Sequence, residues 1–316
     1  MGSANSSFWR AVSRLAKWTH LARLRLIGLL AMALLLPACS TLKLVYNQAP
    51  ELAYWYFDAY ADFNDAQSLQ VKAELTRLQA WHRQTQLPGY SALLQDAQRQ
   101  VRGDITPAQA CAVFADVRGK LVTVGERAEP AAALLAASLE ARQLQQMERR
   151  FAKGNAEYRK DFLDGTPQAR RTHRLDKAIH RAEMLYGRLD DRQTALLGRM
   201  IDQSGFDASR SYGERLRRQK DILETVRQLT GPPAASAMAT ASPAADPASR
   251  ALNGLIKRAI HSPDAAYRAY AEKQITDGCK SFAEFHNATS AAQRDKAAAT
   301  LNGYEKDLAT LAGQGG

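Results

Sequence analysis

"LQQMERRFAKGNAEYRKDF" (144–162) carries the periodicity that decides the fold. Its large apolar side chains recur at spacings of three, four and seven residues, at Leu144, Met147, Phe151, Tyr158 and Phe162. These spacings place them on one face of an α-helix, while charged and polar residues fill the opposite face. We therefore expect an amphipathic helix here, within a long segment that starts near Ala131.

The same periodicity recurs along the chain, and patterns of alternating polar and apolar residues are nearly absent. The other predicted helix faces hold Val71, Leu75, Leu78, His82 and Thr85; Leu175, Ala178, Ala182 and Leu185; Tyr212, Leu216, Ile222, Val226 and Leu229; and Leu301, Tyr304, Leu308 and Leu311. Such stripes give helices a surface to bury against one another. The sequence predicts an all-α, multi-helix bundle of long amphipathic helices.

Prolines and capping residues predict where these helices begin and end. We expect new segments at Thr106-Pro107, Glu129-Pro130, Thr166-Pro167 and Ser262-Pro263, since proline is favoured in a first helical turn. Asp190 with Gln193 predicts a capping box. Pro88 should break or kink the helix that carries Trp81.

The N-terminus has the pattern of a secretory signal. Five basic and no acidic residues precede the apolar run 26–36, which is too short for a membrane span of roughly 20 residues. The run ends in Leu36-Pro37-Ala38-Cys39, which resembles the lipobox of bacterial lipoproteins. We predict a signal peptide at 1–38 and lipidation of Cys39. The alternatives are an ordinary cleaved signal or an uncleaved anchor.

The predicted organisation follows from this signal and from a segment rich in Pro, Ala and Ser. It comprises a signal peptide (1–38), a lipidated N-terminus and tether (39–50), a helical domain (51–229), a flexible loop (230–249) and C-terminal helices on the same domain (250–316). Ser40 follows the cysteine where inner-membrane lipoproteins of the enterobacterial pattern carry Asp. The resemblance therefore implies a lipid-anchored envelope protein, at the outer membrane and facing the periplasm.

The net charge of the chain indicates which classes of binding partner to expect. The chain has a net charge of +11, and residues 1–38 hold five of its 43 basic residues and none of its 32 acidic ones, so residues 39–316 carry +6. We expect attachment to the membrane through lipid on Cys39, an anionic envelope lipid or protein as a partner, no nucleic acid and no cofactor.

Two cysteines remain once Cys39 is set aside. An oxidising compartment and an even count favour a disulfide between Cys111 and Cys279. The alternative is a pair of buried free thiols.

The segment "YWYFDAYADFND" (54–65) places aromatic residues around three aspartates. On a continuous helix, Asp58 and Asp62 would lie at i,i+4, close enough for the acid–base pair of a glycosidase. The alternative is structural: Tyr56, Tyr60 and Phe63 form a core face, and the aspartates are solvated or pair with a base such as Arg83. We favour this structural interpretation and predict no catalytic residues.

Basic residues form a second candidate surface. Arg170, Arg174, Lys177 and Arg181 are spaced to line one helix face, and Arg215, Arg217, Arg218 and Lys220 surround another. Either cluster could bind phosphates, although most charged faces are merely solvated. His180 and Glu183 have half the spacing of a di-metal site. Its second half is missing and arginines surround it, so we predict no metal.

Three stretches together resemble a known family. They are "CSTLKLVYNQAPELAYWYFDAYADF" (39–63), "LQAWHRQTQLPGY" (78–90) and a C-terminal stretch that runs from "AYRAY" (266–270) through Cys279 to "FHNATSAAQRDKAAATLNGYEKDL" (285–308). The matching residues are Cys39, Tyr46, Asn47, Trp55, Asp58, Tyr60, Trp81, His82, Leu87, Tyr90, Tyr267, Tyr270, Cys279, His286, Gln293, Arg294 and Tyr304. The pattern is similar to an uncharacterised family of Gram-negative envelope lipoproteins, a domain of unknown function, and it implies no activity.

These observations favour a non-enzymatic binding or scaffolding protein of the envelope. The alternative is a hydrolase of cell-wall glycan that uses Asp58 and Asp62. The surroundings of these aspartates discriminate between the two, because a hydrolase needs them in an open cleft flanked by aromatic side chains.

Overall fold

The computed structural model describes residues 41–230 and 247–314. The predicted signal peptide, Cys39 and most of the predicted flexible loop lie outside these residues. The chain divides into two compact units, Met1–Tyr46 and Asn47–Gly316. The first contains most of α2 (Thr41–Asn47), so the predicted tether is helical from Thr41 onward.

The second unit is helical throughout, and no strand occurs in residues 41–230 or 247–314. Its helices are α3 (Ala49–Ala61), α4 (Asp65–Thr85), α5 (Leu87–Gln100), α6 (Pro107–Ala137), α7 (Ala141–Phe162), α8 (Pro167–Tyr186), α9 (Asp191–Gln203), α10 (Ala208–Leu229), α12 (Pro247–Ile260), α13 (Ala265–Asn287) and α14 (Ala291–Gly313). The predicted all-α, multi-helix bundle is confirmed.

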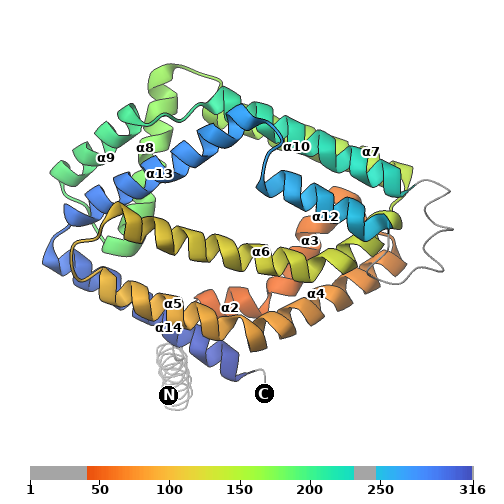
Figure 1. Cartoon of the computed structure of the whole chain (residues 1–316), viewed down its shortest axis with the longest axis horizontal. Coiled ribbons are helices and arrows are strands. Elements are labelled where there is room, and N and C mark those ends of the chain that lie inside the picture. The colour runs from red at the N-terminus through yellow and green to blue at the C-terminus, as the bar shows by residue number, and fades with distance from the viewer. Residues whose placement is uncertain (1–40, 231–246, 315–316) are drawn as a thin grey trace, which may run out of the picture. The chain divides into compact units, whose positions relative to one another are not determined.

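The helices of the second unit pack largely in neighbouring pairs (Figure 1). The helices α7 and α10 lie side by side, and α14 lies along α5. The long helix α6 runs between these pairs and contacts α4, α12 and α13. The C-terminal helices thus pack on helices that precede the segment 231–246, and all belong to one unit.

Two hydrophobic clusters form the core. One joins α3, α6, α7, α10 and α12, and its buried residues include Ala133, Leu144 and Val226. The other joins α8, α9, α13 and α14 around Tyr186 and Phe285. Most of the predicted stripes contribute to these clusters, so amphipathic periodicity supplies the buried faces of the bundle.

The prediction that a new segment begins at Pro130 is wrong. Pro130 lies inside α6, which continues to Ala137. An internal proline costs roughly 3 kcal/mol because it removes a backbone hydrogen bond and clashes with the preceding turn. The residues after it, Ala133 and Ala136, are buried in the first core cluster. This burial keeps the helix continuous.

The long segment expected to start near Ala131 is also two helices. The chain leaves α6 after Ala137 and begins α7 at Ala141. At this junction the Glu140 N–H donates to Gln143 Oε1 at 2.9 Å. Buried Gln143 is also within hydrogen-bond distance of Gln67 on α4. The Glu140–Gln143 bond belongs to a local capping box, whereas the Gln143–Gln67 contact depends on tertiary structure, and apolar periodicity reveals neither.

The other predicted boundaries agree with the structure. Thr106 and Asp190 cap α6 and α9 through reciprocal capping boxes, and Thr166 caps α8. The break at Pro88 separates α4 from α5. After the segment 231–246 the described residues resume at Pro247, which already belongs to α12, so residues 247–249, predicted as part of a flexible loop, are helical.

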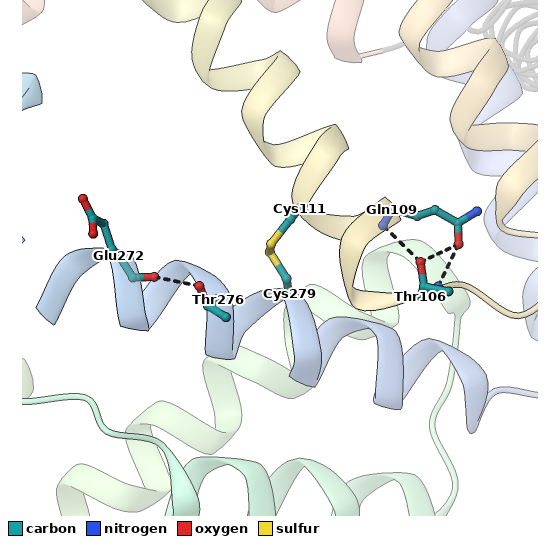
Figure 2. The surroundings of a disulfide bond; sticks show 6 residues. All are labelled: Thr106, Gln109, Cys111, Glu272, Thr276 and Cys279. Carbon is teal, nitrogen blue, oxygen red and sulfur yellow. Dashed lines mark hydrogen bonds between the residues drawn. A yellow bond between two sulfur atoms is a disulfide. The ribbon is translucent and has the colours of Figure 1, made fainter. Parts of the chain in front are cut away.

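A disulfide between Cys111 and Cys279 connects α6 to α13 across 168 residues of sequence (Figure 2). Cys111 lies in the first turns of α6, just after the Thr106–Gln109 capping box. Cys279 is buried near the middle of α13. The bond holds the N-terminal end of the central helix against the C-terminal half of the chain.

Candidate functional site

A groove lies between α4 and α6, with Phe57 of α3 contributing to its wall. Its volume is about 320 Å³, at the small end of the roughly 300–1,000 Å³ found for ligand pockets. Eight of its twelve lining residues are apolar: Phe57, Val71, Leu75, Leu78, Ala128, Ala131, Ala132 and Leu135. It is therefore a hydrophobic hollow in the protein surface.

The sequence of the two helices explains the hollow. Val71, Leu75 and Leu78 recur at helical spacing along α4 and form one wall. The facing wall of α6 is built mainly from alanines, including Ala128 and Ala131. Alanine side chains are too short to fill the space between two helices, so Leu75 and Leu78 remain partly exposed, whereas Val71 at the end of the stripe is buried.

Charged side chains also line this groove. Arg77 and Arg127 are both exposed. Arg77 pairs with Glu74 at 2.8 Å, whereas Arg127 has no carboxylate partner among the described residues and lies over the Trp81 ring, 5.8 Å from its centroid. Because these two arginines and Glu74 are the only charged groups of the lining, the groove carries a net positive charge.

The aspartates of the predicted hydrolase do not share a helix. The helix α3 ends at Ala61, and Asp62 adopts the left-handed conformation with φ 49°. The helix ends there because Asn64 and Gln67 form a capping box that starts α4. Aspartate tolerates this conformation better than most residues. The continuous helix assumed for this pair therefore ends one residue before Asp62, although the Asp62 N–H still donates to the Asp58 carbonyl at 2.7 Å.

Each aspartate has a structural role. Asp58 Oδ1 accepts a hydrogen bond from the backbone N–H of Phe63 at 2.9 Å, which fixes the turn between α3 and α4. Asp62 is exposed and pairs with Arg142 at 3.2 Å, not with Arg83. Arg83 instead donates to Asn47 Oδ1. The two carboxylates thus hold helix junctions together.

The predicted aromatic core face is correct only in part. Tyr60 packs on Phe151 with ring centroids 5.5 Å apart, and Phe63 packs against the first core cluster. Tyr56 is 57% exposed, so its prediction as a core residue is wrong. Tyr56 lies on the same face of α3 as Tyr60, with ring centroids 5.3 Å apart, so the helical spacing is right but does not show that this end of the face stays uncovered.

The predicted basic stripe on α8 is divided between structural and exposed side chains. Arg170 Nη1 donates to the carbonyls of Leu163 and Gly165, and the Arg174 guanidinium donates to Ser204 and lies over Phe206. Lys177 and Arg181 are exposed. Half of the stripe therefore closes the α7–α8 turn and the α9–α10 connection, a use that sequence spacing does not reveal.

Sequence reasoning missed Glu214, the centre of the second basic cluster. Its buried carboxylate accepts hydrogen bonds from Arg217, Arg218 and Ser262 at 2.8–3.1 Å. Burial tends to raise the pKa of Glu214, but these hydrogen bonds and the charge of Arg217 outweigh it and lower the pKa to about 2. The i,i+3 and i,i+4 spacings of Glu214 to the two arginines were the available signal.

A second missed feature is a buried histidine between two polar partners. His286 Nδ1 is 2.8 Å from the Tyr186 hydroxyl, and Nε2 is 2.8 Å from the Gly103 carbonyl. A carbonyl only accepts, so Nε2 carries the proton and Nδ1 accepts from Tyr186. Burial lowers the pKa of His286 and raises that of Tyr186 to about 12, which keeps both groups neutral.

This pair predicts a pH dependence of stability. The lowered pKa of His286 means that the unfolded chain binds a proton more readily, so stability should be highest above the unfolded pKa of 6.5 and fall as the pH decreases below it. The contribution of His286 to this slope should be at most about 1.4 kcal/mol per pH unit. Denaturant titrations at pH 7.5 and 5.5 measure it.

The control replaces a second histidine, His82, whose pKa is also lowered by burial. The dependence should therefore persist in a His82→Gln variant. If it disappears in that variant, His82 and not His286 is its source.

Two further kinds of site are absent from the described residues. No helix within 41–230 or 247–314 combines the length and hydropathy that a membrane span requires. The same residues contain no group of three or more His, Cys, Asp or Glu side chains placed to hold a metal ion. His180 and Glu183 are both exposed on α8.

Comparison with known proteins gives one match. The sequence model of a family of unknown function, DUF6279, matches residues 59–234, which is more than half of the chain. No curated protein and no solved structure matches significantly. The matched region runs from the end of α3 through α10 and includes the α4 and α6 walls of the groove.

Proposed function

The chain belongs to the family of unknown function DUF6279, and on that premise we propose a non-enzymatic binding protein held at the cell envelope by lipid on Cys39. The lipobox-like end of the signal supports the anchor. We place the protein at the outer membrane, facing the periplasm. Multiple acyl chains on one cysteine would make attachment stable, since a single chain binds only marginally.

The proposal that the protein is not an enzyme rests on the structural role of the Asp58 carboxylate. A general acid or nucleophile must reach the substrate with its carboxyl group. The Asp58 carboxylate instead fixes the α3–α4 turn through the Phe63 N–H, and Asp62 is held by Arg142. The hollow between α4 and α6 is the better candidate for contact with a ligand, and its lining has no pair of carboxylates.

The proposal is tested with variants of Cys39 and Asp58 produced in a strain that lacks the gene. Cys39→Ala should leave the membrane fraction or remain unprocessed, as fractionation and the mass of the mature chain will show. Unchanged attachment and mass would exclude the lipid.

Asp58→Asn should keep near-native stability, because the amide oxygen still accepts the Phe63 N–H. Asp58→Ala should lose about 1 kcal/mol, the typical net worth of one hydrogen bond. Function in cells should then follow protein abundance in both variants. A stable, abundant and anchored Asp58→Asn protein that fails to replace the wild type would instead favour the hydrolase.

A further inference from the structure

We propose that the groove between α4 and α6 binds the single aliphatic chain of an amphiphile with an anionic head group. The site is defined by the walls Val71, Leu75 and Leu78 on α4 and by Ala128, Ala131 and Leu135 on α6. The proposal stands on this geometry and does not require lipidation of Cys39.

The size of the groove selects a narrow ligand. Its 320 Å³ is about twice the roughly 150 Å³ of an engineered apolar cavity that accepts benzene. An α-helix with its side chains is roughly 10–12 Å wide and would not enter such a hollow. An unbranched hydrocarbon chain is narrow and flexible enough to follow the cleft between two helices.

The chemistry of the walls agrees with an aliphatic occupant. The α4 and α6 residues that face the hollow are valine, leucine and alanine, apart from Gln70 and the three charged groups. Covering these side chains removes apolar surface from water, which is favourable in proportion to the area buried. A sugar or peptide backbone would leave its polar groups without partners there.

Charge selects the head group. Arg127 is exposed and lacks a carboxylate partner among the described residues, while Arg77 is already paired with Glu74. The Arg127 guanidinium lies 5.8 Å from the centroid of the Trp81 ring, a contact that leaves its N–H donors available to a ligand. A carboxylate or phosphate at the end of an acyl chain could accept those donors, and guanidinium binds both groups in a forked geometry.

The test uses the full-length protein in membranes isolated from the cells that make it. The probe is a fatty acid with a photoreactive diazirine in its chain and a terminal alkyne, added at a sub-saturating concentration. Isolated membranes lack the metabolism that would attach the probe to other lipids. After irradiation, mass spectrometry of the labelled peptides should locate the probe on α4 and α6.

Filling the groove should abolish this labelling. Ala131→Phe places a ring in the hollow and should reduce labelling of α4 and α6 at least fivefold, in line with loss of the apolar contacts. Ala132→Leu, at an exposed position of the same wall, provides a second variant if Ala131→Phe folds poorly. The matched control is Ala115→Phe, an exposed alanine of α6 that does not line the groove.

A comparison of an anionic and a neutral probe tests whether the groove selects an anionic head group. Arg127→Gln should reduce labelling by the fatty-acid probe about tenfold, the usual effect of one charge-assisted hydrogen bond. Labelling by the corresponding neutral fatty alcohol should change little. Equal losses for both probes would overturn the anionic head group.

Three outcomes would contradict the proposal. Labelling that is absent from α4 and α6, or that survives in both groove-filling variants, overturns the site. Labelling that appears only in Cys39→Ala, assayed in whichever cell fraction contains that variant, means that the protein's own acyl chain occupies the groove, which overturns a free amphiphile. Because membrane attachment is measured separately, a failed groove leaves the anchor proposal intact, and a failed anchor leaves the groove intact.

Discussion

Replacing Cys111 and Cys279 together with serine should lower the free energy of unfolding by about 5 kcal/mol. In the chain-entropy model, a crosslink between residues 168 apart restricts the unfolded chain strongly, and its removal restores that entropy. The loss is comparable to the whole stability of a marginal domain, typically about 5–15 kcal/mol. Denaturant titration of the wild type and the double variant measures it.

Reduction provides the control for this prediction. Wild-type protein treated with a thiol reductant should match the double variant, since both remove the link between α6 and α13. The Cys39→Ala background leaves only Cys111 and Cys279 as possible free thiols. Stoichiometric labelling of these thiols in the unfolded, unreduced chain would show that the bond does not form.

The second large effect should come from Glu214→Gln, with a loss of about 3 kcal/mol in unfolding free energy. Removing one partner of a buried ion pair leaves the other partners poorly satisfied, which typically costs ~3–5 kcal/mol. The lower figure applies because Arg217 and Arg218 are partly exposed and regain some hydration. The amide of glutamine also presents N–H groups toward guanidinium donors.

The same helix offers a matched control. Glu224 pairs with Lys220 at 3.7 Å, and both side chains are well exposed. Exposed pairs are worth ~0–1 kcal/mol, so Glu224→Gln should have little effect. If both variants lose the same unfolding free energy, the contribution of Glu214 to stability does not come from its buried hydrogen bonds and ion pairs.

The pH dependence of the unfolding free energy gives an independent test of the role of Glu214. The pKa of Glu214 is about 2 in the folded chain, below its usual 4.5. The unfolded chain therefore binds a proton first as the pH falls, and the stability that Glu214 contributes above pH 4.5 is lost toward pH 2. The difference between wild type and Glu214→Gln should narrow over this interval.

Helical periodicity and capping chemistry were sufficient to predict the fold class. They are local signals: the spacing of apolar residues and the side chain that caps the first turn act within a few residues of sequence. Thr106, Thr166 and Asp190 cap their helices as predicted for this reason. Pro130 departs from the pattern because burial of Ala133 and Ala136 outweighs a local preference.

The candidate site was less accessible to sequence reasoning. The stripe Val71, Leu75 and Leu78 was visible as an apolar face, but nothing local showed that the facing surface of α6 would be built from alanines too small to cover it. Arg127 likewise reads as an ordinary surface charge until Trp81 and the hollow beside it are placed in space.

The sequence by itself determined the all-α class, most helix boundaries and the match of residues 59–234 to an uncharacterised family, and it supplies the lipobox-like pattern on which the proposed lipidation of Cys39 rests. Only the tertiary structure decided which charges are structural. Glu214, Asp62 and His286 each contact a residue far away in the sequence, namely Ser262, Arg142 and Gly103, and these partners meet only after the helices pack. Long-range contacts leave no fixed spacing in the sequence. For this reason only the tertiary structure showed which residues of the basic stripe and the acidic pair have structural partners, and where the groove lies.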